Sequence, residues 1–174
     1  MSDGPVWLVG LMGAGKSAVG RRLAARLDRQ FVDSDLEIER ESGSSIAEIF
    51  AREGEGAFRS RERAFIDAWS GRAAIVALGG GAMAQSGIPE KLARTGRSVY
   101  LRALPTTLAA RVGTGEGRPL LAGLDAAGRL AKLGELLVAR SPFYDAAEVA
   151  VDTDGKSAEA VATEICAALT EEPG

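Results

Sequence analysis

GLMGAGKS, residues Gly10–Ser17, is the most informative part of this sequence for predicting the fold, and it directly follows the apolar run VWLV at Val6–Val9. It fills every fixed position of the P-loop pattern Gly-x-x-x-x-Gly-Lys-Ser, and Val19, Leu23 and Leu27 recur after it at helical spacing. Glycines allow such a loop to turn its amides towards phosphate oxygens, and the start of a helix adds a favourable dipole. The sequence therefore predicts a phosphate-binding loop between a first strand and a first helix.

Outward from this loop, short β-rich runs alternate with helical patterns along the chain. This alternation predicts the α/β class, in which a parallel sheet is covered by helices on both faces. The expected strands are Val6–Val9, Phe31–Asp33, Ala74–Leu78, Val99–Arg102 and Val149–Val151.

Several helices can be placed from spacing and caps. Apolar residues recur at helical spacing between Phe58 and Trp69, and Ser45 with Glu48 forms a capping box that predicts a helix starting at Ile46. Ser157 precedes a helical pattern that runs to about Leu169. The segment 113–123, GTGEGRPLLAG, contains four glycines and is expected to be a loop that moves.

Composition narrows the classes of function. The chain has 174 residues, 46% of them hydrophobic and 26% charged, with a net charge of −3, which predicts a single domain and no nucleic-acid partner. No apolar stretch approaches the roughly 18 to 20 residues that span a bilayer, so we expect no membrane partner. The few residues before Val6 are too short for a targeting peptide, and a cytoplasmic location is expected.

The residue inventory also restricts the chemistry. The sequence contains no histidine, which excludes Ser-His-Asp hydrolysis and histidine-ligated zinc. Its one cysteine, Cys166, lies in the apolar pattern of the last helix and is expected to fill the core. Catalysis must therefore use carboxylates, lysine, arginine, backbone amides and a metal ion held by oxygen.

The P-loop pattern assigns roles to its own residues. Lys16 is expected to reach the β and γ phosphates of a nucleotide, and the Ser17 hydroxyl to coordinate Mg²⁺. Asp33 and Asp35 follow the second expected strand and should emerge at the same sheet edge, one towards the metal and one towards a substrate hydroxyl. A helix cap in a solvated turn is the alternative explanation for this Asp-x-Asp pair.

With these residues in place, the chain resembles the shikimate kinase family, small ATP-dependent kinases of aromatic amino-acid biosynthesis. The resemblance runs nearly end to end and is carried by GLMGAGKS, FVDSDLEIE, SIAEIFAREGEGAFRSRE, LGGGA, RPLL and RSPFY. It implies one kinase domain over residues 1–174, with a substrate-binding region at about 34–62 and a lid at about 113–123. The implied fold is a P-loop three-layer α/β/α arrangement around a five-stranded parallel sheet in the order 2-3-1-4-5.

The resemblance also implies an activity, which is transfer of the ATP γ-phosphoryl group to the 3-hydroxyl of shikimate by a monomer. The implied catalytic residues are Lys16, Asp33 and Arg118, and the implied metal ligands are Ser17 and Asp33. The implied nucleotide-binding residues are Gly13, Ala14, Gly15, Lys16, Ser17, Ala18, Arg111 and Arg118. The implied shikimate-binding residues are Asp35, Arg59, Gly79, Gly80, Gly81 and Arg140, with Glu62 orienting the arginine one helical turn away.

The residues taken alone leave alternatives open. Arg59 and Glu62 lie on one helix face, which suits either a fixed fork for a carboxylate or an ordinary surface ion pair. Arg140 by itself is expected to be a cation at the C-terminal end of a helix. At the level of function, a kinase for another polyol such as gluconate and a catalytically silent nucleotide-binding module are the alternatives.

Overall fold

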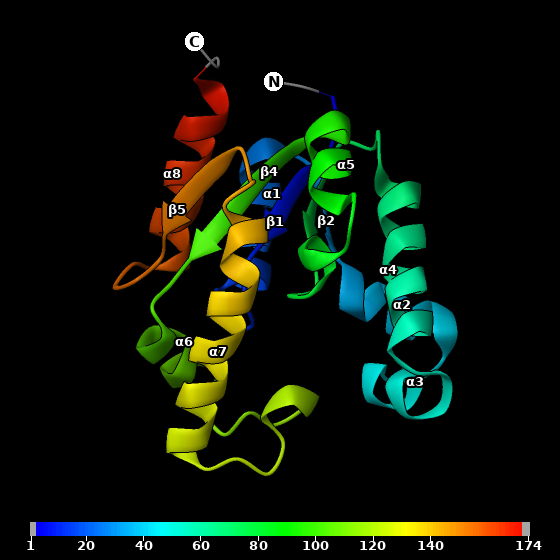
Figure 1. The fold of residues 1–174 in the computed structure, drawn as a ribbon. Coiled ribbons are helices and arrows are strands. Elements are labelled where there is room, and N and C mark those ends of the chain that lie inside the picture. Colours follow the sequence, from blue (N-terminus) through cyan, green and yellow to red (C-terminus); the bar gives the residue numbers. More distant parts are fainter. Residues whose placement is uncertain (1–2, 172–174) are drawn as a thin grey trace.

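All five predicted strands join one parallel sheet in the order β2-β3-β1-β4-β5 (Figure 1). The computed structural model describes residues 3–171. The strands are β1 (Val6–Val9), β2 (Gln30–Asp33), β3 (Ala74–Ala77), β4 (Arg97–Arg102) and β5 (Val149–Asp152). The α-helices are α1 (Lys16–Leu27), α2 (Ser34–Ser42), α3 (Ile46–Glu53), α4 (Glu55–Trp69), α5 (Ile88–Thr95), α6 (Pro105–Val112), α7 (Ala126–Tyr144) and α8 (Ala158–Thr170). Two short 3₁₀ helices are η1 (Ala82–Ala84) and η2 (Pro119–Leu121).

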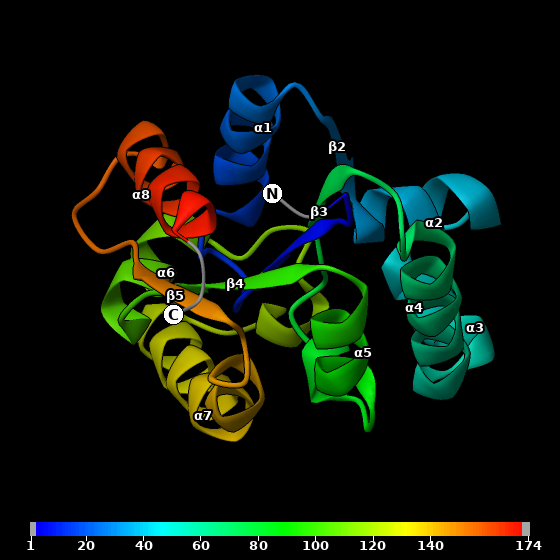
Figure 2. The ribbon, with the colours of Figure 1, turned by 90° about the horizontal axis from the view of Figure 1, so that it is seen from above.

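The helices form layers on the two faces of the sheet. Figure 2 shows α1 and α8 over one face and α5 and α7 over the other, while α2, α3 and α4 gather beyond the β2 edge. The three-layer α/β/α architecture and the strand order are therefore confirmed. Within residues 3–171, the helices are all too short or too polar to cross a membrane.

The central strands are apolar along their whole length because helices cover both faces. Every residue of β1 and of β3 is buried, and Trp7 and Leu8 have no exposed surface. A second, smaller core of Ile38, Ile49 and Phe58 holds α2, α3 and α4 together. The residues that follow β2 thus have apolar packing of their own, next to the edge of the sheet.

Element ends agree with the expectations to within one or two residues. Ser45 and Glu48 form the predicted capping box at the start of α3, and Ser157 caps α8. Cys166 is partly buried and packs against the main core. The patterns in the sequence did not predict α2, α5, α6 and α7 as individual helices.

One expectation about α7 is wrong. The helix does not end near Arg140 but continues through Pro142 to Tyr144, and no basic residue lies in its last turn. A proline removes the hydrogen bond to the carbonyl four residues earlier, here that of Val138, whose side chain is 77% exposed. The turn that the proline weakens therefore lies on the exposed side of α7.

Candidate active site

The P-loop runs between the buried end of β1 and the start of α1. Gly10 has φ of 146°, and a Cβ there would lie 2.7 Å from the carbonyl oxygen of Leu101 on β4. Gly15 has φ of 94° and occupies the left-handed N-cap position of α1, without any capping side chain. The first amides of α1 are therefore not occupied by a side-chain cap, which is the arrangement of an anion-binding helix start.

Lys16 extends back along the loop that precedes it. Its ammonium donates hydrogen bonds to the carbonyl oxygens of Gly10 at 2.7 Å and Leu11 at 3.1 Å. Burial lowers the pKa of this ammonium to about 8, while Asp35 and Asp33 act in the opposite direction. The lysine is thus a poorly solvated cation beside the loop amides, which strengthens its attraction for phosphate.

Asp33 connects the P-loop to the substrate side of the sheet edge. Its Oδ2 accepts a hydrogen bond from the Ser17 hydroxyl at 2.8 Å. Its Oδ1 accepts from the amides of Asp35 at 3.0 Å and Leu36 at 3.3 Å, which caps α2. Both interpretations of the Asp-x-Asp pair therefore apply, because one carboxylate caps the helix and also faces the P-loop serine.

The oxygens of Ser17 and Asp33 suit a hard divalent cation. Mg²⁺ is held in kinase sites by one or two protein oxygens together with water and phosphate, so two adjacent oxygens meet the protein's share. Within residues 3–171, no group of three or more Asp, Glu or Cys side chains is arranged to hold a metal ion by itself. The donor set fits Mg²⁺ shared with a nucleotide better than a metal ion enclosed by protein.

Asp35 occupies the next position along the same edge. Its Oδ1 is buried and has no hydrogen-bond partner. Burial, and to a lesser extent Asp33, raises the pKa of the Asp35 carboxyl. A Cβ at Gly79 would lie 2.7 Å from this Oδ1, so a larger residue there would displace the carboxylate. A buried acceptor without a donor costs free energy, and a ligand hydroxyl would satisfy it.

Glu62 holds the Arg59 side chain in place through an ion pair. The two side chains form an ion pair of 2.6 Å on one face of α4, and Glu62 is only 1% exposed. The Nε2 of Gln85 donates to the same carboxylate at 2.8 Å. Burial raises the pKa of Glu62 to about 7, although Arg59 acts to lower it. The pair is therefore not a simple surface ion pair, since its acid is buried and held by two donors.

The glycine segment after β3 lies between two arginines. A Cβ at Gly81 would meet the Arg59 guanidinium, and a Cβ at Gly80 would lie 3.1 Å from Nη1 of Arg140 on α7. Elements distant in sequence thus bring two guanidinium groups to one short stretch of backbone. Two such groups at one place suit a carboxylate ligand.

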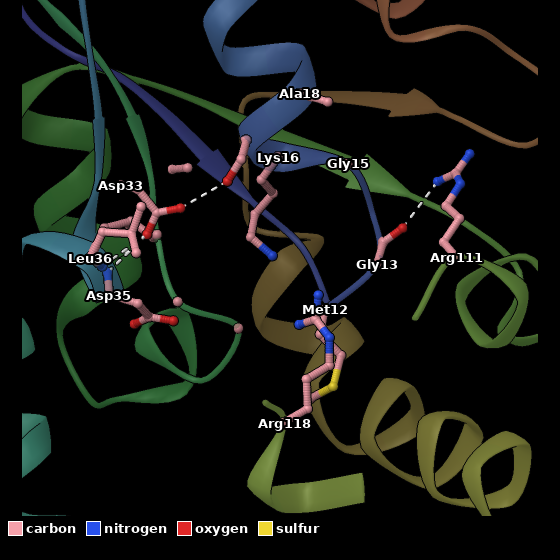
Figure 3. A pocket seen from close by; sticks show the side chains of 15 residues that line it. Met12, Gly13, Gly15, Lys16, Ala18, Asp33, Asp35, Leu36, Arg111 and Arg118 are labelled. Carbon is pink, nitrogen blue, oxygen red and sulfur yellow. Dashed lines mark hydrogen bonds between the residues drawn. The ribbon is translucent and has the colours of Figure 1, made fainter. Parts of the chain in front are cut away.

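A cavity of about 450 Å³ lies over the P-loop at the carboxyl end of the sheet. In Figure 3, Asp33 and Asp35 lie on one side of it, Arg111 on the other and Lys16 between them, while Arg118 extends up from the lid segment. Of the predicted site residues, the following line the cavity: Gly13, Gly15, Lys16, Ser17, Ala18, Asp33, Asp35, Gly79, Gly80, Arg111 and Arg118. Four others do not line it: Ala14, which is buried within the P-loop, Gly81, which ends the glycine segment, and Arg59 and Arg140, which lie beside that segment.

Arg111 makes four hydrogen bonds that the sequence did not predict. It donates to the carbonyl oxygens of Gly13 at 3.2 Å and Ala14 at 3.3 Å, and to both Oγ1 and the carbonyl oxygen of Thr153 at 2.9 and 2.8 Å. This guanidinium joins the P-loop to the turn after β5. It therefore has a clear structural role in addition to the adenine contact implied by resemblance.

Sequence reasoning missed several residues at the site. Met12 and Leu36 line the cavity, and Gln85 and Thr153 hold predicted residues in place. Met12 occupies a variable position of the P-loop pattern and so carries no signal of its own. Leu36 directly follows the Asp-x-Asp pair, and this position is the one signal in the sequence; its 58% exposure is visible only in the structure.

Comparison with known proteins agrees with this geometry. The shikimate kinase family model matches residues 12–170. The shikimate kinase of Symbiobacterium thermophilum is 47% identical over 169 residues, covering 94% of this chain and 95% of the relative. That of Moorella thermoacetica is 43% identical over 168 residues, covering 95% and 94%.

Solved structures give the same result. The shikimate kinase from Acinetobacter baumannii in complex with shikimate has a TM-score of 0.88 and 39% identity, covering 95% of this chain and 92% of that one. A gluconokinase from Sinorhizobium meliloti 1021 has a TM-score of 0.62 at 18% identity, covering 96% and 91%, which is a likeness of fold alone. With a family match over nearly the whole chain and relatives above 40% identity, this chain belongs to the shikimate kinase family.

Proposed function

We propose that this chain transfers the γ-phosphoryl group of ATP to the 3-hydroxyl of shikimate, giving shikimate 3-phosphate and ADP in chorismate and aromatic amino-acid biosynthesis. The main support is the close approach of a carboxylate-binding pair of arginines and the unpartnered Asp35 oxygen to a complete P-loop. Family membership indicates the substrate class. The residues of the site offer groups that match the carboxylate and the hydroxyl of the substrate and the phosphates of ATP.

Substrate positioning falls to the side chains around the glycine segment. Arg59 and Arg140 bind the carboxylate of shikimate, and Glu62 fixes the fork of Arg59 for this contact. Asp35 accepts a hydrogen bond from a ring hydroxyl through its buried Oδ1. Gly79, Gly80 and Gly81 line the same site with backbone. Together these contacts hold the 3-hydroxyl in line with the phosphoryl group.

Charge neutralisation falls to the P-loop side. Phosphoryl transfer requires little covalent help from the protein, because positioning and electrostatic stabilisation supply most of the acceleration. Lys16 and Arg118 contact the transferring phosphoryl group, and Asp33 assists loss of the hydroxyl proton. Ser17 and Asp33 are the residues that would hold Mg²⁺, which when bound offsets the charge of the phosphates. Gly13, Ala14, Gly15, Ala18 and Arg111 complete the nucleotide site.

The same proposal covers the organisation of the chain. We propose one kinase domain in which residues of about 34–62 form the substrate-binding region and residues of about 113–123 form the lid. Leu121 is 1% exposed and anchors the lid in the core, while the glycines before Arg118 leave the rest of it free to move. We further propose a monomer that works in the cytoplasm without a nucleic-acid partner.

An ADP-release assay with ATP and Mg²⁺ across a panel of hydroxy acids tests this function. We expect ADP with shikimate, little with quinate or gluconate, and none when EDTA removes Mg²⁺. Release of ADP with gluconate but not with shikimate would show a kinase for a different acid. ATP binding without ADP release on any acid would indicate a catalytically silent nucleotide-binding module.

A further inference from the structure

We propose that Tyr144 is a positioning residue for the substrate site, because its hydroxyl holds the backbone of the glycine segment after β3 beside the arginine on α7. The inference rests on the proposed function and adds to it a residue that touches neither nucleotide nor substrate. Tyr144 is the last residue of α7 and is 1% exposed. Its hydroxyl donates a hydrogen bond to the carbonyl oxygen of Gly80.

The same hydroxyl lies close to Arg140. The two residues are four apart in α7, a spacing that places them on one helix face. The position of a Cβ at Gly80 would be 3.1 Å from Nη1 of Arg140 and 3.7 Å from Oη of Tyr144. The guanidinium and the hydroxyl therefore converge on Gly80, and the hydroxyl donates to its carbonyl oxygen.

The rest of the tyrosine is fixed by packing. Its ring lies against that of Tyr100 on β4, with centroids 5.0 Å apart and planes inclined by 32°. Burial raises the pKa of Tyr144 to about 12, so its hydroxyl keeps the proton that it donates. Packing of the ring thus fixes the position of the hydroxyl. The hydroxyl in turn holds Gly80 in place beside Arg140.

Loss of this hydroxyl has a specific consequence. Phenylalanine at position 144 would keep the ring contact but leave the Gly80 carbonyl without its donor. Gly80 lines the cavity over the P-loop and also borders the Arg140 guanidinium that we propose for the shikimate carboxylate. The change should therefore weaken shikimate more than ATP.

Steady-state kinetics of Tyr144→Phe test this, with Tyr100→Phe as the matched control from the same buried ring pair. We expect Tyr144→Phe to raise KM for shikimate about tenfold, since a buried carbonyl loses its donor, and to leave KM for ATP within about twofold. Tyr100→Phe should leave both KM values within about twofold. A lower melting temperature with unchanged KM for shikimate, or equal rises in both KM values, would overturn the proposal.

A second measurement does not depend on the folding of Tyr144→Phe. The chain has two tyrosines, so Tyr100→Phe leaves Tyr144 as the only site for biosynthetic incorporation of 3-fluorotyrosine. We expect its ¹⁹F resonance to shift when shikimate is added and to stay in place with ADP and Mg²⁺. A resonance that is unmoved by shikimate would overturn the proposal. The unmodified chain's ADP release with shikimate tests the function itself, so failure of one is distinguishable from failure of the other.

Discussion

Glu62→Gln should stabilise the fold at alkaline pH, by an amount that grows as the pH rises through about 7. Burial raises the pKa of Glu62 from its ordinary value of 4.5 to about 7, so the folded state binds its proton more tightly than the unfolded state. A group of this kind contributes most to stability below pH 4.5, and the contribution is lost as the pH rises to about 7. Glutamine has the same shape and does not titrate.

The size of the effect follows from the two pKa values. Their full difference corresponds to about 3 kcal/mol, and most of it develops between pH 5 and pH 8. Relative to the unmodified chain, Glu62→Gln should therefore gain about 2 to 3 kcal/mol in the free energy of unfolding between those limits. Carboxyls distant from Glu62 titrate in both proteins and cancel in the difference, whereas Asp35 acts on Glu62 and cancels only in part.

Urea denaturation of the two proteins between pH 5 and pH 8 measures this difference directly. Glu55→Gln is the matched control, because Glu55 also pairs with Arg59, at 3.4 Å, but its side chain is 67% exposed. The control removes a carboxylate that pairs with the same guanidinium without removing a buried one. A difference between Glu62→Gln and the unmodified chain that stays constant across the range would refute the reasoning, because Glu62 would then not titrate near pH 7.

Three further substitutions test the assigned roles. Lys16→Ala should abolish turnover while the melting temperature stays within a few degrees, because the substitution removes a poorly solvated charge. A collapsed melting transition would show that Lys16 has a structural role. Arg59→Lys should raise KM for shikimate at least about tenfold more than KM for ATP, because an ammonium cannot form a two-pronged contact; equal losses would remove Arg59 from the substrate site. Arg118→Ala should lower kcat about a hundredfold or more with little change in ATP affinity, and a normal kcat at saturation would exclude a catalytic role.

Local patterns predicted the parts of the molecule that depend on neighbours in sequence. The P-loop, the strands and the caps at Ser45 and Ser157 each arise from residues within one or two turns of one another. The spacing of Arg59 and Glu62 likewise placed both on one helix face, and the structure joins them. The order of the strands came from family resemblance, because periodicity alone does not rank parallel strands.

Contacts between distant segments could not be predicted in this way. Gln85 and Glu62 are 23 residues apart, Tyr144 and Gly80 are 64 apart, and Arg111 and Gly13 are 98 apart. Nothing in the spacing of such pairs signals contact. The path of α7 through Pro142 was misjudged for a related reason, since a proline is tolerated only where the turn it weakens faces solvent.

The amino-acid sequence by itself determined the class of fold, the phosphate loop and the kinds of side chain available for chemistry, because these follow from periodicity and residue type. Only the tertiary structure decided which of those side chains are buried and which groups surround them. Burial brings the pKa of Glu62 to about 7 and that of Lys16 to about 8. Burial also leaves one oxygen of Asp35 without a hydrogen-bond partner. The physical reason is that desolvation depends on every segment packed around a group, and those segments come together only when the chain folds.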